Sequence, residues 1–375
     1  MRMFAAFAGL ALLFAILWDA FETIVLPRRI TRHYRLARLF YRSTWEPWRR
    51  IALLYPDKRR ESLLSFFGPI SFLMLLFLWA VAIMFAFSLL HYGFGSRLEG
   101  DGPTTFWTCL YFSGTSLFTL GLGDVRPIGF AARLLTVAEA GTGFGFLALV
   151  IGYFPVLYQS FSRREVHISL LDAHAGSPPT AVELLHRSLR TGPEKLNDQL
   201  VAWEIWCAEL MESHLSYPVL CYFRSQHDNT SWLAVLAVVM DTSALIIANT
   251  EGETRHQAEM TFAMARHAIV DLSQTFMQAP IQRSYDRFDE TSLAAIRTLF
   301  NEHGLPLRAS EAACADRLRE LRAMYEPYVQ SLGSYILMTI PPFQREKRPD
   351  NWQTSAWGRI TAKLDVNEIA DDDHL

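Results

Sequence analysis

The sequence predicts an all-α membrane protein with three transmembrane helices, a re-entrant helix between the second and third, and an all-α cytoplasmic C-terminal domain. Hydrophobic residues make up 51% of the 375 residues, which is high for a soluble protein. Three apolar stretches reach the length of about 20 residues that a bilayer requires. Beyond them, apolar residues recur mostly with the period of an α-helix.

The chain is expected to form five consecutive segments. They are an additional N-terminal transmembrane helix at 1–27, a basic amphipathic segment at 28–61, a membrane core at 62–162, a helical cytoplasmic domain at 163–343 and a disordered tail at 344–375. The net charge of −3 gives no reason to expect a nucleic-acid partner. The cysteines lack metal-ligand spacing, so we expect free thiols in a reducing compartment. They are Cys109, Cys207, Cys221 and Cys314.

Residues 3–26 form the first predicted span. A cleaved signal peptide is the alternative, but no small-x-small site follows the apolar run, and Asp19 and Glu22 stand where cleavage would occur. These two carboxylates are three residues apart, so they share a helix face. They either face protein or water inside the membrane, which would mark function, or pair at the interface with Arg28 and Arg29. The interfacial pairing is favoured.

Residues 28–60 are rich in arginine and lysine, so the positive-inside rule places them in the cytoplasm and the amino terminus outside. Apolar residues interleave with these charges, which predicts an amphipathic helix on the membrane surface that contacts anionic lipids. The apolar residues are Leu36, Leu39, Phe40, Trp45 and Trp48. A voltage sensor is the second interpretation, but Pro27 and the lack of companion sensor helices count against it. The arginines that suggest it recur every third residue: Arg29, Arg32, Arg35 and Arg38.

Residues 63–92 form the second predicted span, which contains no charged residue and runs outward. An external loop follows at 93–103. Pro103 and Thr104 are expected to begin a short helix at 104–117, because a hydroxyl cap beside a proline is a common start. This helix is too short to cross a bilayer, so protein must bury it. The dipole of this helix places partial negative charge at its carboxyl end, which points toward the interior of the membrane core. This charge favours a cation at that place.

Residues 119–124, with the sequence Thr-Leu-Gly-Leu-Gly-Asp, follow this short helix. Backbone carbonyls that replace the water shell of an ion must all point one way, which requires alternating backbone handedness. Gly121 and Gly123 occupy alternate positions and reach positive φ at no steric cost. The hydroxyl of Thr119 adds an oxygen below the carbonyls. The pattern therefore predicts a cation-binding filter of backbone oxygens.

With its flanking segments, this motif resembles the pore of tetrameric potassium channels of the bacterial ion-channel-2 type, with a filter like that of two-pore-domain channels. The usual filter reads T-V-G-Y-G-D, and the resemblance covers residues 62–161 as outer helix, pore helix, filter and inner helix. Leu122 stands where the family mostly has Tyr or Phe, although Leu occurs in some two-pore-type channels. Phe118 stands where the family often has Thr. Both differences change the side chains that pack behind the filter. They therefore bear on how strictly the filter selects potassium over sodium.

The resemblance implies a homotetramer that conducts K⁺ passively, because one filter segment per chain requires several chains to form carbonyl rings. The implied ligands are the carbonyls of Thr119, Leu120, Gly121 and Leu122, with Gly123 in the filter and Asp124 at its outer mouth. The implied filter supports are Tyr111, Phe112, Thr115 and Glu139, with a hydrogen bond between Tyr111 and Asp124. No enzyme activity and no cofactor are implied; K⁺ is the permeant ion, and the location is the inner (plasma) membrane. The sequence identifies no regulatory ligand.

Residues 129–161 form the third predicted span, the inner helix. By the resemblance, Gly143 is a gating hinge, and a second set faces the cavity or gate: Phe144, Leu147, Ile151 and Pro155. For Gly141 and Gly145, packing of small residues between membrane helices is favoured. Glu139 either lies behind the filter near Thr115 or Ser116, or pairs with Arg133.

The C-terminal domain is predicted to be helical. The helices are expected at 180–190, 194–215, 253–277, 290–303 and 309–338. The apolar run 231–248 resembles a fourth span, but Asp241 at its centre and the lack of basic flanks favour a buried core helix. The domain has no G-x-G-x-x-G after a strand, no jelly-roll pattern and no metal-ligand spacing among its histidines. It is expected to help tetramerise the pore or to sense a ligand.

Two other functions stay open from the sequence. The aliphatic Leu122 would suit a weakly selective cation channel. A channel-like membrane sensor that signals through its helical domain is the other alternative. Stoichiometry distinguishes that sensor, since a signalling dimer does not close a four-fold filter.

Overall fold

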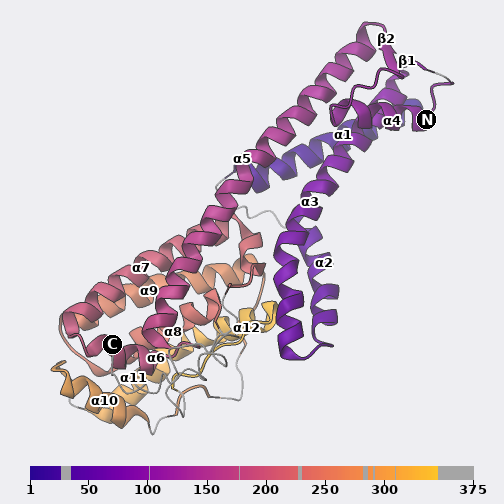
Figure 1. Ribbon diagram of the computed structural model, residues 1–375. Helices are drawn as coiled ribbons and strands as arrows, with labels where there is room; N and C mark the ends of the chain where they lie inside the picture. Colours follow the sequence, from indigo (N-terminus) through magenta and orange to yellow (C-terminus); the bar gives the residue numbers. More distant parts are fainter. Residues whose placement is uncertain are drawn as a thin grey trace, which may run out of the picture.

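The computed structural model describes residues 1–26, 35–100, 102–176, 178–226, 230–281, 286–289, 292–308 and 310–344. The expectations for Arg28, Arg29 and Arg32, and for the tail after Gln344, lie outside the described residues. The molecule is elongated, with long helices at one end and a helical domain at the other (Figure 1). It is an all-α membrane protein, and two three-residue strands are the only sheet among the described residues.

The first span packs closely along the second. Helix α1 (Arg2–Ala20) continues as the short π-helix η1 (Phe21–Val25) and lies against α3 (Asp57–Phe94). Glycines make the close approach possible, because a Cβ on Gly9 would lie 2.8 Å from the carbonyl oxygen of Ala86. A Cβ on Gly93 would lie 2.4 Å from the backbone nitrogen of Ala6. Small residues at such crossings let membrane helices associate through backbone contact.

Helix α2 (Leu36–Ala52) runs beside the first part of α3 (Figure 1). Part of its apolar side is covered by protein: Trp45 is only 2% exposed, and its indole Nε1 donates to the carbonyl oxygen of Tyr335 at 3.2 Å. Leu36 and Leu39 at its start are 43% and 64% exposed, and the membrane-surface helix stays a prediction. Arg35, which precedes α2, is extended (φ −126°, ψ 136°), so the three-residue arginine spacing does not continue as one helix through it.

The region between the second and third spans contains a short helix and a small ribbon. Helix α4 (Phe106–Leu117) is capped by Thr105, one residue later than the predicted Thr104. Thr105 accepts from the backbone of Thr108, whose own hydroxyl accepts from the backbone N–H of Thr105, so two free helix-end donors are satisfied. Strand β1 (Arg97–Glu99), in the predicted loop, pairs antiparallel with β2 (Arg126–Ile128). The ribbon closes the outer end of this region.

The inner helix is longer than predicted. Helix α5 (Phe130–Ala175) has 46 residues, and it continues well past the expected end at residue 161. Pro155 lies inside it without ending it. Arg164, just past the predicted end, is buried and contacts the C-terminal domain, whereas its neighbour Arg163 is exposed. Figure 1 shows α5 reaching from the ribbon to that domain.

The C-terminal domain packs around one fully buried helix. Its elements are α6 (Ala181–Leu189), α7 (Pro193–Ser216), the 3-10 helix η2 (Pro218–Tyr222), α8 (Trp232–Asn249), α9 (Glu253–Thr275), α10 (Ser292–Glu302), α11 (Glu311–Ala323) and α12 (Glu326–Ile336). All 18 residues of α8 are buried, so this apolar helix is the core of the domain rather than a further span. The helical pattern predicted at 309–338 is split near Tyr325, because Pro327 is tolerated only in the first turn of a helix.

A buried Arg164–Glu165 ion pair on α5 makes hydrogen bonds to this domain. Arg164 donates from Nη1 to the carbonyl oxygen of Leu220 at 2.9 Å and from Nη2 to that of Phe223 at 3.0 Å. Its neighbour Glu165 accepts from the backbone nitrogen of Gln226 at 3.0 Å. The ring of Phe223 in turn lies so close to Gly68 of α3 that a Cβ there would be 2.6 Å away. One loop of the domain therefore holds both long membrane helices.

Candidate functional site

The backbone after α4 alternates in handedness. Thr119, Gly121 and Gly123 have φ values of 58°, 57° and 78°, while Leu120 and Leu122 between them do not have positive φ. The sequence predicted this conformation for the two glycines. It gave no signal for Thr119, a β-branched residue that rarely adopts positive φ and is strained there. Alternation of this kind turns successive carbonyls toward one side of an extended chain.

Hydrogen bonds fix the start of this segment to the end of α4. The backbone nitrogens of Leu120 and Gly121 both donate to the carbonyl oxygen of Thr115, at 2.9 and 3.2 Å. The nitrogen of Thr119 donates to the carbonyl oxygen of Ser116 at 3.2 Å. Thr115 therefore supports the segment through its backbone, while its hydroxyl donates to the carbonyl oxygen of Phe112 within the helix.

The other end of the segment is tied back to α4 by a side chain. The hydroxyl of Tyr111 donates to Oδ2 of Asp124 at 2.7 Å, which is the contact expected from the sequence. Both side chains are exposed in the single chain. The two attachments, one at Thr115 and one at Tyr111, fix both ends of the segment between Thr119 and Asp124 to α4.

One side of the segment is open within the chain. Leu120 and Leu122 are 63% and 64% exposed, and a Cβ on Gly121 or Gly123 would meet no atom within 4 Å. This side of the segment is therefore uncovered by the rest of the described chain. Non-helical backbone at membrane depth is tolerated only where protein buries it or where it lines water.

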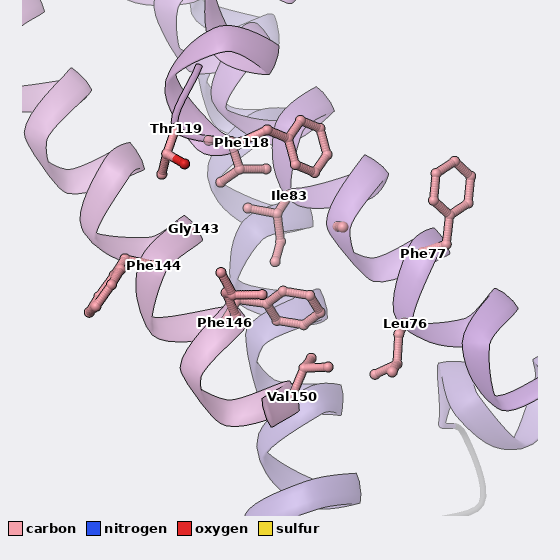
Figure 2. Close-up of a pocket in the computed structure, with 12 residues that line it drawn as sticks. Leu76, Phe77, Ile83, Phe118, Thr119, Gly143, Phe144, Phe146 and Val150 are labelled. Atoms are coloured by element: carbon pink, nitrogen blue, oxygen red, sulfur yellow. The ribbon is translucent and has the colours of Figure 1, made fainter. Parts of the chain in front are cut away.

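An apolar cavity of about 280 Å³ lies below Thr119, between α3 and α5 (Figure 2). Leu76 and Ile83 line it from α3, and Phe146 and Val150 line it from α5. Its lining is mostly hydrocarbon, and Thr119 contributes a polar side chain at its upper end. Two of the residues expected to face the pore, Phe144 and Leu147, also line this cavity. Both are largely exposed in the single chain, as is Ile151, with exposed fractions of 68%, 52% and 63%.

Gly143 is a contact point between α5 and the end of α4. A Cβ at this position would lie 2.4 Å from the carbonyl oxygen of Leu117. The close-packing role that the sequence favoured for Gly141 and Gly145 thus falls on Gly143, since a Cβ on either of the others would meet nothing within 4 Å in this chain. The helix is continuous through Gly143.

Glu139 is fully buried and pairs with a residue that the sequence reasoning missed. Its Oε2 lies 3.2 Å from Nε2 of His91, near the end of α3. Arg133, the partner considered from the sequence, donates to the carbonyl oxygen of Pro127 at 3.4 Å instead. The available signal was a histidine inside the otherwise uncharged second span. Such a group needs a partner in the membrane.

The two acidic residues of the first span also face protein. Asp19 is 4% exposed and accepts from the backbone nitrogens of Leu36 and Ala37, both at 3.0 Å, and from the indole of Trp79 at 3.2 Å. It therefore satisfies free donors at the start of α2. Glu22 accepts from the indole of Trp18 at 2.8 Å. The pairing with Arg28 and Arg29 that the sequence favoured falls outside the described residues.

Within the part of the chain that the structure describes, no group of three His, Cys, Asp or Glu side chains lies close enough together to hold a metal ion. The four cysteines are free and buried. Burial raises the pKa of the Cys207 and Cys221 thiols well above the ordinary range, so both stay protonated and do not act as thiolate ligands.

Long membrane helices around a re-entrant helix, followed by a segment of alternating backbone, define the class of ion-channel pore domains. Residues 72–159 match the family model Ion_trans_2, described as "Ion channel". The match contains α4, residues 119–124 and most of the membrane parts of α3 and α5. The chain thus carries an ion channel domain, which points to a transport role rather than an enzymatic one.

A comparison with curated proteins finds a relative that is itself a membrane protein. The chain is 23% identical over 277 residues to the uncharacterized membrane protein YdjJ of Bacillus subtilis (strain 168), covering 72% of this chain and 78% of the relative. No solved structure matches the chain. The similarity extends beyond the ion channel domain, so the relative shares more than the pore region.

Proposed function

We propose that the chain forms a homotetrameric channel that conducts potassium ions passively. The observation that carries the proposal is the alternating backbone at Thr119, Gly121 and Gly123, inside the region that matches the ion channel family. Four such segments around an axis would stack rings of carbonyl oxygens that replace the water shell of a dehydrated cation. The ligands in this proposal are the carbonyls of Thr119, Leu120, Gly121 and Leu122.

The open side of the filter segment supports the proposal of several chains. Residues 119–123 leave one face uncovered, and the exposed apolar residues of α5 continue below it. Further copies of the chain would cover these surfaces around an aqueous path, as re-entrant backbone requires. In this arrangement Asp124 attracts cations at the outer mouth, and Gly143 and Pro155 belong to the gate.

A weakly selective cation channel is the second candidate. Leu122 is an aliphatic side chain, 64% exposed, where related filters mostly carry an aromatic brace. It offers no hydroxyl or ring to hold the filter at a fixed width. If the filter widens, sodium passes as well as potassium.

The proposed location is the inner (plasma) membrane, with the amino terminus outside and the helical domain in the cytoplasm. The basic residues of α2 and the start of α3 support this orientation. Arg50, Lys58 and Arg59 are exposed, so we propose that they contact anionic lipid headgroups. No cofactor takes part in the proposed function.

The reversal potential of the purified full-length protein in a planar bilayer tests the proposal. With potassium on one side and sodium on the other, we expect reversal near the potassium equilibrium potential. A clear current that reverses near zero would replace the proposal with the weakly selective channel. Protein that purifies as a dimer and carries no current would overturn both.

Tyr111→Phe tests the attachment at the outer end of the filter. This substitution removes the donor to Asp124 and with it a charge-assisted hydrogen bond. We expect currents that decay at least several-fold faster during sustained conduction. Tyr92→Phe is the matched control, because the Tyr92 hydroxyl makes no hydrogen bond to any residue that the structure describes. Equal decay rates in the two variants would show that the Tyr111–Asp124 contact is dispensable.

A further inference from the structure

A buried polar cluster lies beside the pore helix on the side of α3. His91 is 0% exposed, with Nδ1 2.9 Å from the hydroxyl of Ser96 and Nε2 3.2 Å from Oε2 of Glu139. These contacts suit a ring that accepts from Ser96 and donates to Glu139. The ring also meets Phe112 of α4 edge-on, with centroids 5.2 Å apart and planes at 86°. One side chain of α3 thus touches both α4 and α5.

Burying these polar side chains costs free energy unless they make hydrogen bonds to one another. Glu139 and His91 have no exposed surface, and both lie at membrane depth, where a polar group without a partner is strongly unfavourable. The hydroxyl of Ser113 on α4 also lies near the carboxyl group of Glu139, but the two side chains do not reach ordinary hydrogen-bond geometry. The contact with His91 is the hydrogen bond of this carboxyl group that has such geometry. A pair used only to fill space would be served better by apolar residues.

The cluster also lies next to the groups that hold the filter segment. Phe112, which His91 contacts, offers its carbonyl oxygen to the hydroxyl of Thr115 at 2.9 Å. The carbonyl oxygen of Thr115 in turn accepts from Leu120 and Gly121. A shift of α4 at Phe112 would be passed within one helical turn to the first carbonyls of the filter segment.

We infer that His91 is a positioning residue for ion conduction: by bonding Glu139 and bracing Phe112, it fixes the pore helix between α3 and α5. The inference rests on the proposed function, because it assigns a support to the same filter. His91 does not touch the ion. It acts through Glu139 and through the pore helix, whose last turn holds the backbone of the filter.

The experiment compares four full-length variants with wild type in bilayers. His91→Leu removes the ring contacts, and His91→Gln keeps an amide donor near the position of Nε2. The double variant His91→Leu/Glu139→Leu removes both polar partners. Ser88→Ala is the matched control, since Ser88 is equally buried on α3 but its hydroxyl donates to the carbonyl oxygen of Met84 in the same helix. Current decay, reversal potential and thermal unfolding are measured for each.

We expect His91→Leu to speed current decay at least ten-fold and to shift the reversal potential toward zero, while His91→Gln and Ser88→Ala stay within two-fold of wild type. The double variant should regain the unfolding temperature of wild type and still show fast decay. A recovered unfolding temperature together with fast current decay would show that His91 positions the pore helix and does not only stabilise the fold. Recovery of both properties in the double variant, or wild-type decay in His91→Leu, would overturn the inference. The wild-type current by itself tests the proposed function, and the differences among variants test His91.

Discussion

Gly121→Ala is expected to abolish potassium current. Gly121 has φ 57° at the centre of the alternating segment, and an L-residue pays about 1–2 kcal/mol in that conformation. In a tetramer the strain occurs four times around the same carbonyl ring. In the variant, the peptide next to Ala at position 121 would rotate to relieve this strain. The rotation would turn a carbonyl ligand away from the ion. We therefore expect the loss of current to exceed 100-fold.

Gly141→Ala is the matched control for this substitution. Gly141 is also a glycine without an atom within 4 Å of an added Cβ, but it lies in the regular part of α5 and does not have positive φ. Alanine is favourable in a helix, so current and assembly should be retained. Single-channel recording of both variants, with size-exclusion chromatography to verify assembly, makes the comparison. Wild-type current through Gly121→Ala would remove residues 119–123 from the conduction path.

Arg287→Ala is expected to destabilise the C-terminal domain by about 3–5 kcal/mol, because it leaves a buried carboxylate without its cation. Asp241 lies in the middle of the fully buried α8 and is 0% exposed. It accepts from Nη2 of Arg287 at 2.7 Å and from the hydroxyl of Tyr325 at 2.5 Å. For a domain of this size, the loss corresponds to a fall in the unfolding temperature of about 10 °C.

Thermal unfolding of the full-length protein in detergent measures this effect. Arg317→Ala provides the control, since the Arg317–Glu320 pair on α11 is partly exposed and surface pairs contribute at most about 1 kcal/mol. Replacing both buried partners, as Arg287→Met with Asp241→Leu, should recover much of the lost stability. An Arg287→Ala protein that melts with the wild type would mean that Asp241 is neutral or has another partner.

The sequence predicted the spans well because membrane insertion depends on local hydrophobicity and length. The predicted spans 3–26 and 63–92 fall within a few residues of α1 with η1 and of α3, and α5 begins within a residue of the predicted inner helix. The short pore helix and the positive φ of Gly121 and Gly123 were likewise predictable. They depend on a dozen neighbouring residues and on the conformational freedom of glycine.

The partners of buried polar groups were not predictable in the same way. Glu139 was expected beside Thr115, Ser116 or Arg133, and it bonds His91, 48 positions earlier in the chain. Asp241 was recognised as foreign to a membrane span, but the sequence did not identify Arg287 as its cation. A charged residue in an apolar stretch indicates that it has a partner in the fold. Which residue is that partner depends on how helices distant in the sequence pack together.

From the sequence alone one could predict the membrane-spanning helices and the positive φ of Gly121 and Gly123. The folded molecule was needed to show that α2 lies against α3 and α12, that α5 continues into the C-terminal domain, and that Asp19 accepts from the first backbone nitrogens of α2. The physical reason is the range of the interactions. Hydrophobic length and backbone freedom act over one or two helical turns, while a burial partner is set by contacts between residues far apart in the chain.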